Sequence, residues 1–158
     1  MIDYKHIINT VVKGLHEYLD CPVIPSNRTA EVPKYPYVSY TITTPTSANK
    51  GTYEEYADCV RKQVTQTWSI TALSDDDIES LVIANKARDW LGYIGRMYLK
   101  EKDIIVQSVG AVTPRDNVLT VGYEHKKGFD CLFTCYDVVK ITDAETIEKV
   151  DIDADIKG

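Results

Sequence analysis

Strict alternation of apolar and polar residues predicts a long β-strand from Arg61 to Leu73. Val64, Trp68 and Ile70 share its apolar face with Gln66. The other face is polar and is made of Arg61, Gln63, Thr65, Thr67, Ser69 and Thr71. Such a pattern is typical of a strand with one face on a core and the other face wet or against a partner.

A second alternating segment, Tyr37–Thr44, is expected to pair with this strand as a hairpin. Between the two lies Pro45–Asp58, a long polar segment that is expected to form a protruding loop. Loops of this length in a small domain are usually functional or disordered. Pro25–Pro36, before the first strand, is expected to be an irregular connection.

Two helices are predicted from the helical spacing of apolar residues. The first runs from about Asp3 to Leu19, and Pro22 prevents its continuation. The second begins at Ser74 and runs to Tyr93 or beyond. Ser74 can cap the free amide groups while the three acids Asp75, Asp76 and Asp77 face the positive helix end. An aspartate triplet could also bind a metal, but capping accounts for all three residues.

The second helix carries apolar residues on two sides. One broad face includes Trp90 and Leu91, and it can cover the sheet. Ile78, Leu81 and Val82 form a second patch over the first two turns. That patch needs either the first helix or a neighbouring chain, and packing on the first helix is the simpler account.

The C-terminal part is predicted to add further strands. Ile104–Thr113 is apolar on both faces, as in a strand that is buried on both sides. Val118–His125 and Phe129–Val139 flank Lys126-Lys127-Gly128, which is typical of a hairpin with glycine at its turn. The element order indicates an α+β domain with two helices on one face of a mostly antiparallel sheet. The expected core includes Trp68, Ile70, Trp90, Leu91 and Phe133.

Length and charge limit the organisation. A chain of 158 residues fits one domain, which we expect to span residues 1–140. Residues 141–158 hold six acids and two lysines, so they carry −4 of the net charge of −6 and are expected to form a flexible acidic tail. A negative protein is a poor match for nucleic-acid binding, which needs clustered Lys and Arg. Without a signal peptide or membrane-spanning run, we expect synthesis in the cytoplasm and no membrane partner.

The sequence offers no familiar catalytic motif. The four cysteines lack CxxC spacing and are expected to be free thiols. There is no G-x-S-x-G elbow and no glycine-rich phosphate loop, and the histidines are placed on a polar helix face or at a strand end. We therefore expect no enzyme, no cofactor and no catalytic or metal site.

Several short segments follow one another in a familiar order. They are Ser26-Asn27, Tyr35–Tyr40, Gln66–Ile70, Asp89–Leu91, Val106–Gly110, Arg115-Asp116, and Tyr123-Glu124 through Gly128–Asp130. Together they resemble the neck and tail-terminator proteins of long-tailed bacteriophages and prophages. The resemblance covers most of Ser26–Asp137 and rests on order and spacing. The family has no catalytic residues to carry over.

The resemblance implies a structural protein of the virion, at the tail or neck. It implies a homo-oligomeric ring, usually of six subunits, that caps the tail-tube protein, stops its polymerisation and meets the head connector. DNA would pass through without sequence-specific binding. A closed ring needs two different, complementary flanks on each subunit. The expected contact residues, in the loop and on the polar strand face, are Asn49, Lys50, Tyr53, Glu54, Tyr56, Arg61, Gln63, Thr65 and Thr67.

Two other interpretations remain at this stage. The first is another phage structural protein, either a head-completion adaptor or a tube subunit. The second is a small-molecule-binding or enzymatic α+β domain of a different class.

Overall fold

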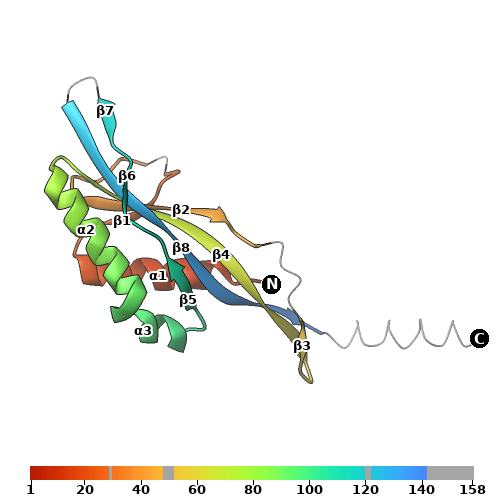
Figure 1. Cartoon of the computed structure of the whole chain (residues 1–158). Helices are drawn as coiled ribbons and strands as arrows, with labels where there is room; N and C mark the ends of the chain where they lie inside the picture. Colours follow the sequence, from red (N-terminus) through yellow and green to blue (C-terminus); the bar gives the residue numbers. More distant parts are fainter. Residues whose placement is uncertain (29, 48–51, 120–121, 142–158) are drawn as a thin grey trace, which may run out of the picture.

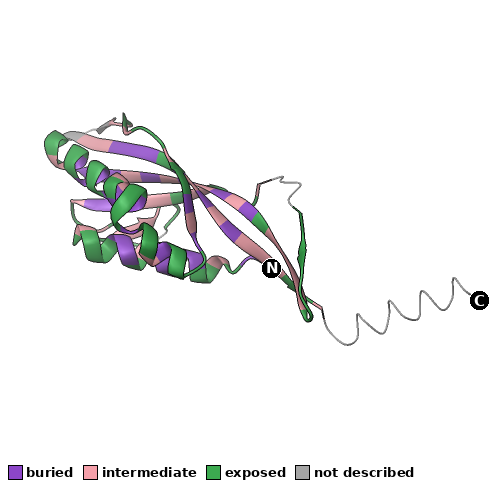
Figure 2. Ribbon diagram, turned by 60° about the horizontal axis from the view of Figure 1, so that its bottom comes forward, coloured by how far each residue is buried: buried purple, intermediate pink, exposed green. Residues whose placement is uncertain are grey.

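The computed structural model describes residues 1–141 except 29, 48–51 and 120–121. A twisted sheet carries the helices on one face, as Figures 1 and 2 show. Its main strands lie in the order β1 (Val23–Pro25), β2 (Tyr37–Thr44), β4 (Cys59–Ser74), β8 (Gly122–Lys140) and β5 (Ile105–Val109). Only the β1–β2 pair among these is parallel. The predicted α+β class with a mostly antiparallel sheet is therefore confirmed.

Short strands extend this sheet. β3 (Glu54–Glu55) pairs with β4, and β6 (Thr113–Pro114) and β7 (Asn117–Leu119) pair with β8. β3 lies inside the expected Pro45–Asp58 loop, so the end of that segment folds back onto β4. The expected irregular connection from Pro25 begins directly after β1, a strand that periodicity could not reveal because it has three residues.

The first two helices each begin after an aspartate that caps a free amide. Asp3 caps α1 (Tyr4–Leu19) by accepting from the amide of His6 at 3.0 Å. α2 (Asp77–Asp89) is capped by Asp76, not by Ser74 as predicted. Ser74 is still the last residue of β4, and its hydroxyl accepts from the Asp76 amide at 3.0 Å.

A helical run continues after α2, as the sequence predicted. A π-helical turn, η1 (Trp90–Ile94), leads into α3 (Arg96–Glu101). The Trp90 ring fills the space above Gly95, where an added Cβ would lie 2.2 Å from the indole. Trp90 is thereby held against α1, and its buried side chain joins the core.

The core lies between the helices and the alternating face of β4. Trp68 is 0% exposed, and its ring stacks on Tyr40 at 5.1 Å and meets the edge of Phe133 at 5.5 Å. Its indole nitrogen donates to Gln66 Oε1 at 3.1 Å, so the buried glutamine supplies the acceptor that the indole needs. All the predicted core residues, Trp68, Ile70, Trp90, Leu91 and Phe133, are buried.

The predicted turn at Lys126–Gly128 is wrong. β8 runs unbroken through it, with Lys126 opposite Leu73 and Gly128 opposite Thr71 of β4. The glycine serves a close approach instead, because a Cβ at Gly128 would lie 2.6 Å from the Ile70 carbonyl oxygen and 2.8 Å from the Arg115 guanidinium. The hairpin before β8 is formed with β7, whose Leu119 lies opposite Gly122.

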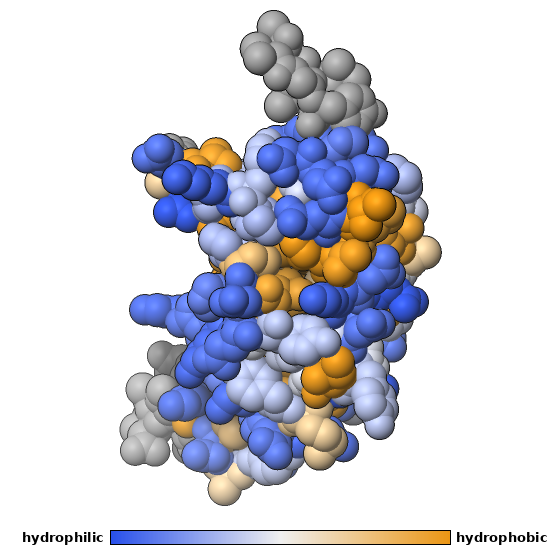
Figure 3. Space-filling view, turned by 90° about the vertical axis from the view of Figure 1, so that its left-hand side faces the viewer, coloured by the Kyte–Doolittle hydropathy of each residue, from blue (hydrophilic) through white to orange (hydrophobic). Residues whose placement is uncertain are grey.

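Two expectations of burial are also wrong. Ile104–Thr113 is not buried on both sides, because β5 is the edge strand and has helices on one face only; Gln107 and Ser108 are exposed. The patch of Ile78, Leu81 and Val82 is not covered by α1. These three side chains are 68%, 36% and 45% exposed, and Figure 3 shows hydrophobic surface on this side of the molecule.

Replacing Trp68 with Ala should lower the free energy of unfolding by ~3–5 kcal/mol, because the change leaves a cavity between β4, β8 and the helices. Thr67→Ala, on the opposite face of the same strand, is the matched control and should change it by less than ~0.5 kcal/mol. Urea denaturation measures both. A near-neutral Trp68→Ala would contradict this description of the core.

Candidate functional site

The outer ends of β4 and β8 project beyond the helices as a β-arm, which we define as residues 53–63 and 136–141 (Figure 1). The two strands stay in register to their ends, where Cys59 lies opposite Lys140. β3 pairs with β4 as a third strand of the arm. The amide of Ile141 donates to the Asp58 carbonyl at 2.9 Å. The arm is therefore a hydrogen-bonded extension of the sheet.

Arg61 organises the side chains of the β-arm. Its Nε donates to Glu54 Oε2 at 3.0 Å, and its guanidinium lies 4.3 Å from the ring centre of Tyr136 and 5.2 Å from that of Tyr56. The Tyr56 hydroxyl donates to the same Glu54 oxygen at 2.9 Å. The hydrogen bond from Arg61 lowers the pKa of Glu54, so this carboxylate stays charged and paired.

The same arm exposes aromatic and apolar surface. Tyr53 and Tyr56 are 50% and 47% exposed, and Val139 is 42% exposed. The Lys62 ammonium lies 4.9 Å from the ring centre of Tyr53, which is a second cation–π contact. Tyrosine and arginine are both enriched in protein–protein interfaces, so this composition is typical of a contact surface.

The structure brings three of the predicted contact residues together, Glu54, Tyr56 and Arg61, whereas Tyr53 contacts Lys62 on the other face of the arm. The other predicted contact residues lie further along the sheet or outside the described residues. Gln63 is exposed at the base of the arm, and Thr65 and Thr67 lie on the open sheet face. Asn49 and Lys50 lie outside the described residues. Sequence reasoning missed Tyr136, because only the β4–β8 register places it opposite Gln63 and beside Arg61.

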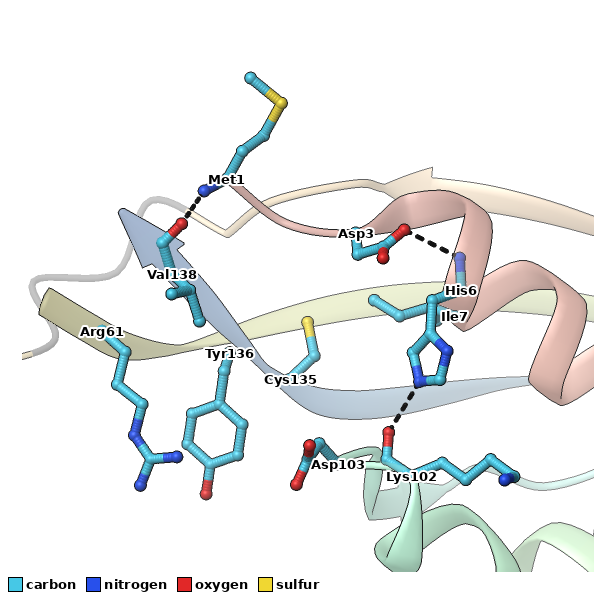
Figure 4. A pocket seen from close by; sticks show the side chains of 10 residues that line it. All are labelled: Met1, Asp3, His6, Ile7, Arg61, Lys102, Asp103, Cys135, Tyr136 and Val138. Atoms are coloured by element: carbon cyan, nitrogen blue, oxygen red, sulfur yellow. Dashed lines mark hydrogen bonds between the residues drawn. The ribbon is translucent and has the colours of Figure 1, made fainter. Parts of the chain in front are cut away.

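A cavity of about 240 Å³ separates the base of the arm from the helices (Figure 4). His6 of α1 reaches across to the Lys102 carbonyl at 3.0 Å, and the Met1 amino group donates to the Val138 carbonyl. In Figure 4 the side chains of Arg61 and Tyr136 project side by side from the two strands. The Met1 contact ties the N-terminus to β8 in the arm, and the His6 contact ties α1 to the end of α3 beside it.

Arg115 occupies the inner part of the open sheet face. Its guanidinium donates to Ser69 Oγ at 2.6 Å and Thr71 Oγ1 at 2.9 Å, and it pairs with Asp130 at 3.2 Å. The polar face of β4 is therefore divided. Its inner part is satisfied within the subunit, whereas the part nearer the arm holds Thr65 and Thr67, which are half-buried among the described residues.

A second charged group lies at the start of α2. The Lys127 side chain is 4% exposed, and its ammonium lies 2.6 Å from Asp116 and 2.9 Å from Asp77. His125 is 3.2 Å from Asp77. Two carboxylates and an imidazole could hold a cation, but the Lys127 ammonium already supplies the positive charge between the acids. Of the predicted aspartate triplet, Asp76 is a cap and Asp77 belongs to this ion-pair cluster.

The cluster shifts two pKa values in the directions expected of an ion pair. The hydrogen bond from Lys127 lowers the pKa of Asp116. Burial acts to lower the pKa of Lys127, but the hydrogen bonds to Asp116 and Asp77 outweigh it, so this pKa is raised. The cluster therefore ties α2 to β8 with both groups charged over the neutral range.

Comparison with known protein families identifies the class of this protein. The chain matches, over residues 9–158, the model of a family described as phage neck terminator protein. The chain belongs to this family. The match is wider than the resemblance noted from the sequence and includes the acidic tail. No curated protein matched the chain.

As a phage neck terminator, the protein belongs to a structural family of the virion rather than to a family of enzymes. Membership implies contacts with other head or tail proteins of the phage. None of the described helices is long and apolar enough to cross a membrane. The β-arm is thus a feature of a protein that works by assembly.

Stability should depend on pH through Asp116. A carboxylate whose pKa is lowered by folding stabilises the protein above its unfolded pKa of ~3.9, and this contribution is lost as the pH falls through the lower folded value. We expect Asp116→Asn to destabilise the protein near neutral pH and to become equal to wild type in strong acid.

Urea midpoints measured between pH ~2 and ~7 test this expectation. Asp75→Asn is the control, since this exposed residue between β4 and α2 should shift the free energy of unfolding by less than ~0.5 kcal/mol. An Asp116→Asn effect that is the same at every pH would contradict the role of the charge.

Proposed function

We propose that this neck terminator forms a ring at the head-proximal end of the phage tail, where it ends tail-tube polymerisation and joins the tail to the head connector. The observation that carries the proposal is the β-arm, with its exposed Tyr53 and Tyr56 beyond the core. Family membership supports the location. The number of six subunits rests on the family resemblance alone.

A ring of identical subunits needs a head-to-tail contact between two different surfaces. The β-arm supplies one surface that is already shaped by hydrogen bonds along β4 and β8. A preorganised contact costs less conformational entropy on assembly than a flexible loop does. The open stretch of the polar face with Gln63, Thr65 and Thr67 continues the same surface towards the body.

The charges on the arm suit burial in an interface. Glu54 and Arg61 neutralise each other at 3.0 Å, and the rings of Tyr56 and Tyr136 shield the guanidinium. Burying an unpaired charge would be costly, whereas a paired and stacked one is tolerated. The arm can therefore bury this part of its surface against a neighbouring subunit or the tail tube without leaving Glu54 or Arg61 unpaired.

The acidic net charge fits the passage of DNA through such a ring. At a net charge of −6 the subunit carries an overall repulsion towards phosphates. DNA would then pass without sequence-specific binding. Salt screens this repulsion over a Debye length of ~8 Å at physiological ionic strength, so the repulsion acts only at short range.

The double variant Tyr53→Ser/Tyr56→Ser tests the proposal. Both side chains lie beyond the core, so the subunit should keep its thermal unfolding temperature, yet lose the contact surface of the arm. We expect loss of assembly with tail tubes and a fall of ~10²-fold or more in the plaque titre of a phage that depends on this copy. Two interface tyrosines at ~2 kcal/mol each would be enough for this effect.

Lys13→Ser/Glu17→Ser is the matched control, because both residues are exposed on α1 away from the arm. It should support a normal titre. A normal titre with the tyrosine variant, in a protein that is present at wild-type levels, would refute the role of the arm.

A further inference from the structure

An apolar groove of about 370 Å³ runs between α3 and β5. It is lined by Tyr93, Arg96, Met97, Lys100, Ile105 and Val106. Adjacent residues of a strand point to opposite faces, so a groove that touches both Ile105 and Val106 lies along the outer edge of β5. Tyr93 and Met97, one helical turn apart, are 83% and 64% exposed above it.

The outer edge of β5 is open for pairing. In the described part of the chain, β5 is the last strand of the sheet and pairs only with β8. An unpaired edge next to an apolar groove is the surface that an added β-strand requires, because main-chain hydrogen bonds give affinity and pockets take alternate side chains.

The rim of this groove is positively charged. Arg96 and Lys100 are exposed on α3, and neither has an ion-pair partner among the residues that the structure describes. The occupant should therefore be a strand with apolar residues on its groove side, and a negative charge on that strand would be attracted to the rim.

One segment of this chain has that sequence. Residues 150–156 read Val-Asp-Ile-Asp-Ala-Asp-Ile, with every second residue apolar and every intervening residue an aspartate. The segment lies outside the described residues, inside the part matched by the family. Its period of two is that of a β-strand with one apolar and one acidic face.

The direction of the arm favours a groove on another subunit. β8 pairs with the start of β5 at Thr134, and Ile141 lies ~23 Å further out at ~3.3 Å per residue. To return to its own β5, residues 142–149 would have to reverse and then span the same distance almost fully extended, at ~3.3 Å per residue. A tail that continues outward has no such restriction.

We infer that residues 150–156 of one subunit add as a strand to the outer edge of β5 of a neighbouring subunit. Val150, Ile152 and Ile156 enter the groove, and the negative charge of the aspartates, on the other face of the added strand, is attracted to the basic rim. The inference rests on the proposed ring and names a second contact within it. The groove is then the second surface of the head-to-tail contact, and it complements the side of the subunit that carries the arm.

The first test uses two full-length variants. The first variant, Asp151→Lys/Asp153→Lys/Asp155→Lys, reverses the charge of the tail and so leaves the groove empty. A synthetic peptide with the natural sequence of residues 142–158 is then titrated into this variant by calorimetry. We expect binding that weakens with salt. A peptide of the same composition in scrambled order is the control. Adding Arg96→Gln/Lys100→Gln to the same chain removes the positive charge of the rim without making it attractive to the reversed tail, and this should weaken peptide binding ~5-fold or more. Absence of binding, or equal binding of the scrambled peptide, would overturn the inference.

The second test is hydrogen exchange of the amides of β5 in wild-type protein over a wide concentration range. Protection that rises with concentration is expected of a tail that comes from another subunit. Either of two results would overturn the inference: no protection at any concentration, or equal protection at every concentration, as from the subunit's own tail. The variant that combines the charge-reversed tail with Arg96→Glu/Lys100→Glu in the groove rim should regain the amide protection that either charge reversal alone removes.

These outcomes are separable from those of the proposed function. Peptide binding and amide protection need neither a phage nor a ring, so they can succeed even if the protein does not end tail growth. Conversely, if the ring is correct and this contact is wrong, the reversed-tail variant will sustain a normal plaque titre.

Discussion

The pairing of β4 with β8 is the interaction on which the rest of the structure depends. It extends without a break from Cys59 opposite Lys140 to Ser74 opposite His125. At its inner part the apolar faces of both strands meet the helices, and Trp68 with Phe133 closes the core. At its outer part the same ladder continues without helices and becomes the β-arm. One pairing thus provides both the stability of the subunit and the reach that assembly needs.

Long unprotected strands are a hazard, because their edges invite unspecific pairing. In the arm, β3 covers part of one edge, and Arg61 stacks between Tyr56 and Tyr136 above the strands. The charged cluster around Lys127 holds the opposite end of the ladder to α2. The open edge of β5, with its apolar groove and basic rim, is the surface that these devices leave available to a strand of suitable sequence.

Sequence periodicity predicted the parts of the fold that local physics decides. The face of β4 with Trp68 was correct because a half-buried strand must alternate, and the Asp3–Leu19 helix was correct because one stripe must face a core. Gly128 was misread as a turn because its real cause, the approach of Arg115, comes from residues distant in sequence. Tyr136 was missed for the same reason, since the strand register decides its neighbours. The contact role of all nine predicted residues, Thr65 and Thr67 among them, remains a prediction.

A terminator acts by stopping a polymer, so its absence must show in the length of that polymer. The most direct measurement is the distribution of tail lengths, by electron microscopy, in lysates of a phage that lacks this protein. Tubes that are longer than wild type and variable in length are the predicted result. Tubes of normal length beside tail-less heads would contradict the account and would instead indicate an adaptor on the head side.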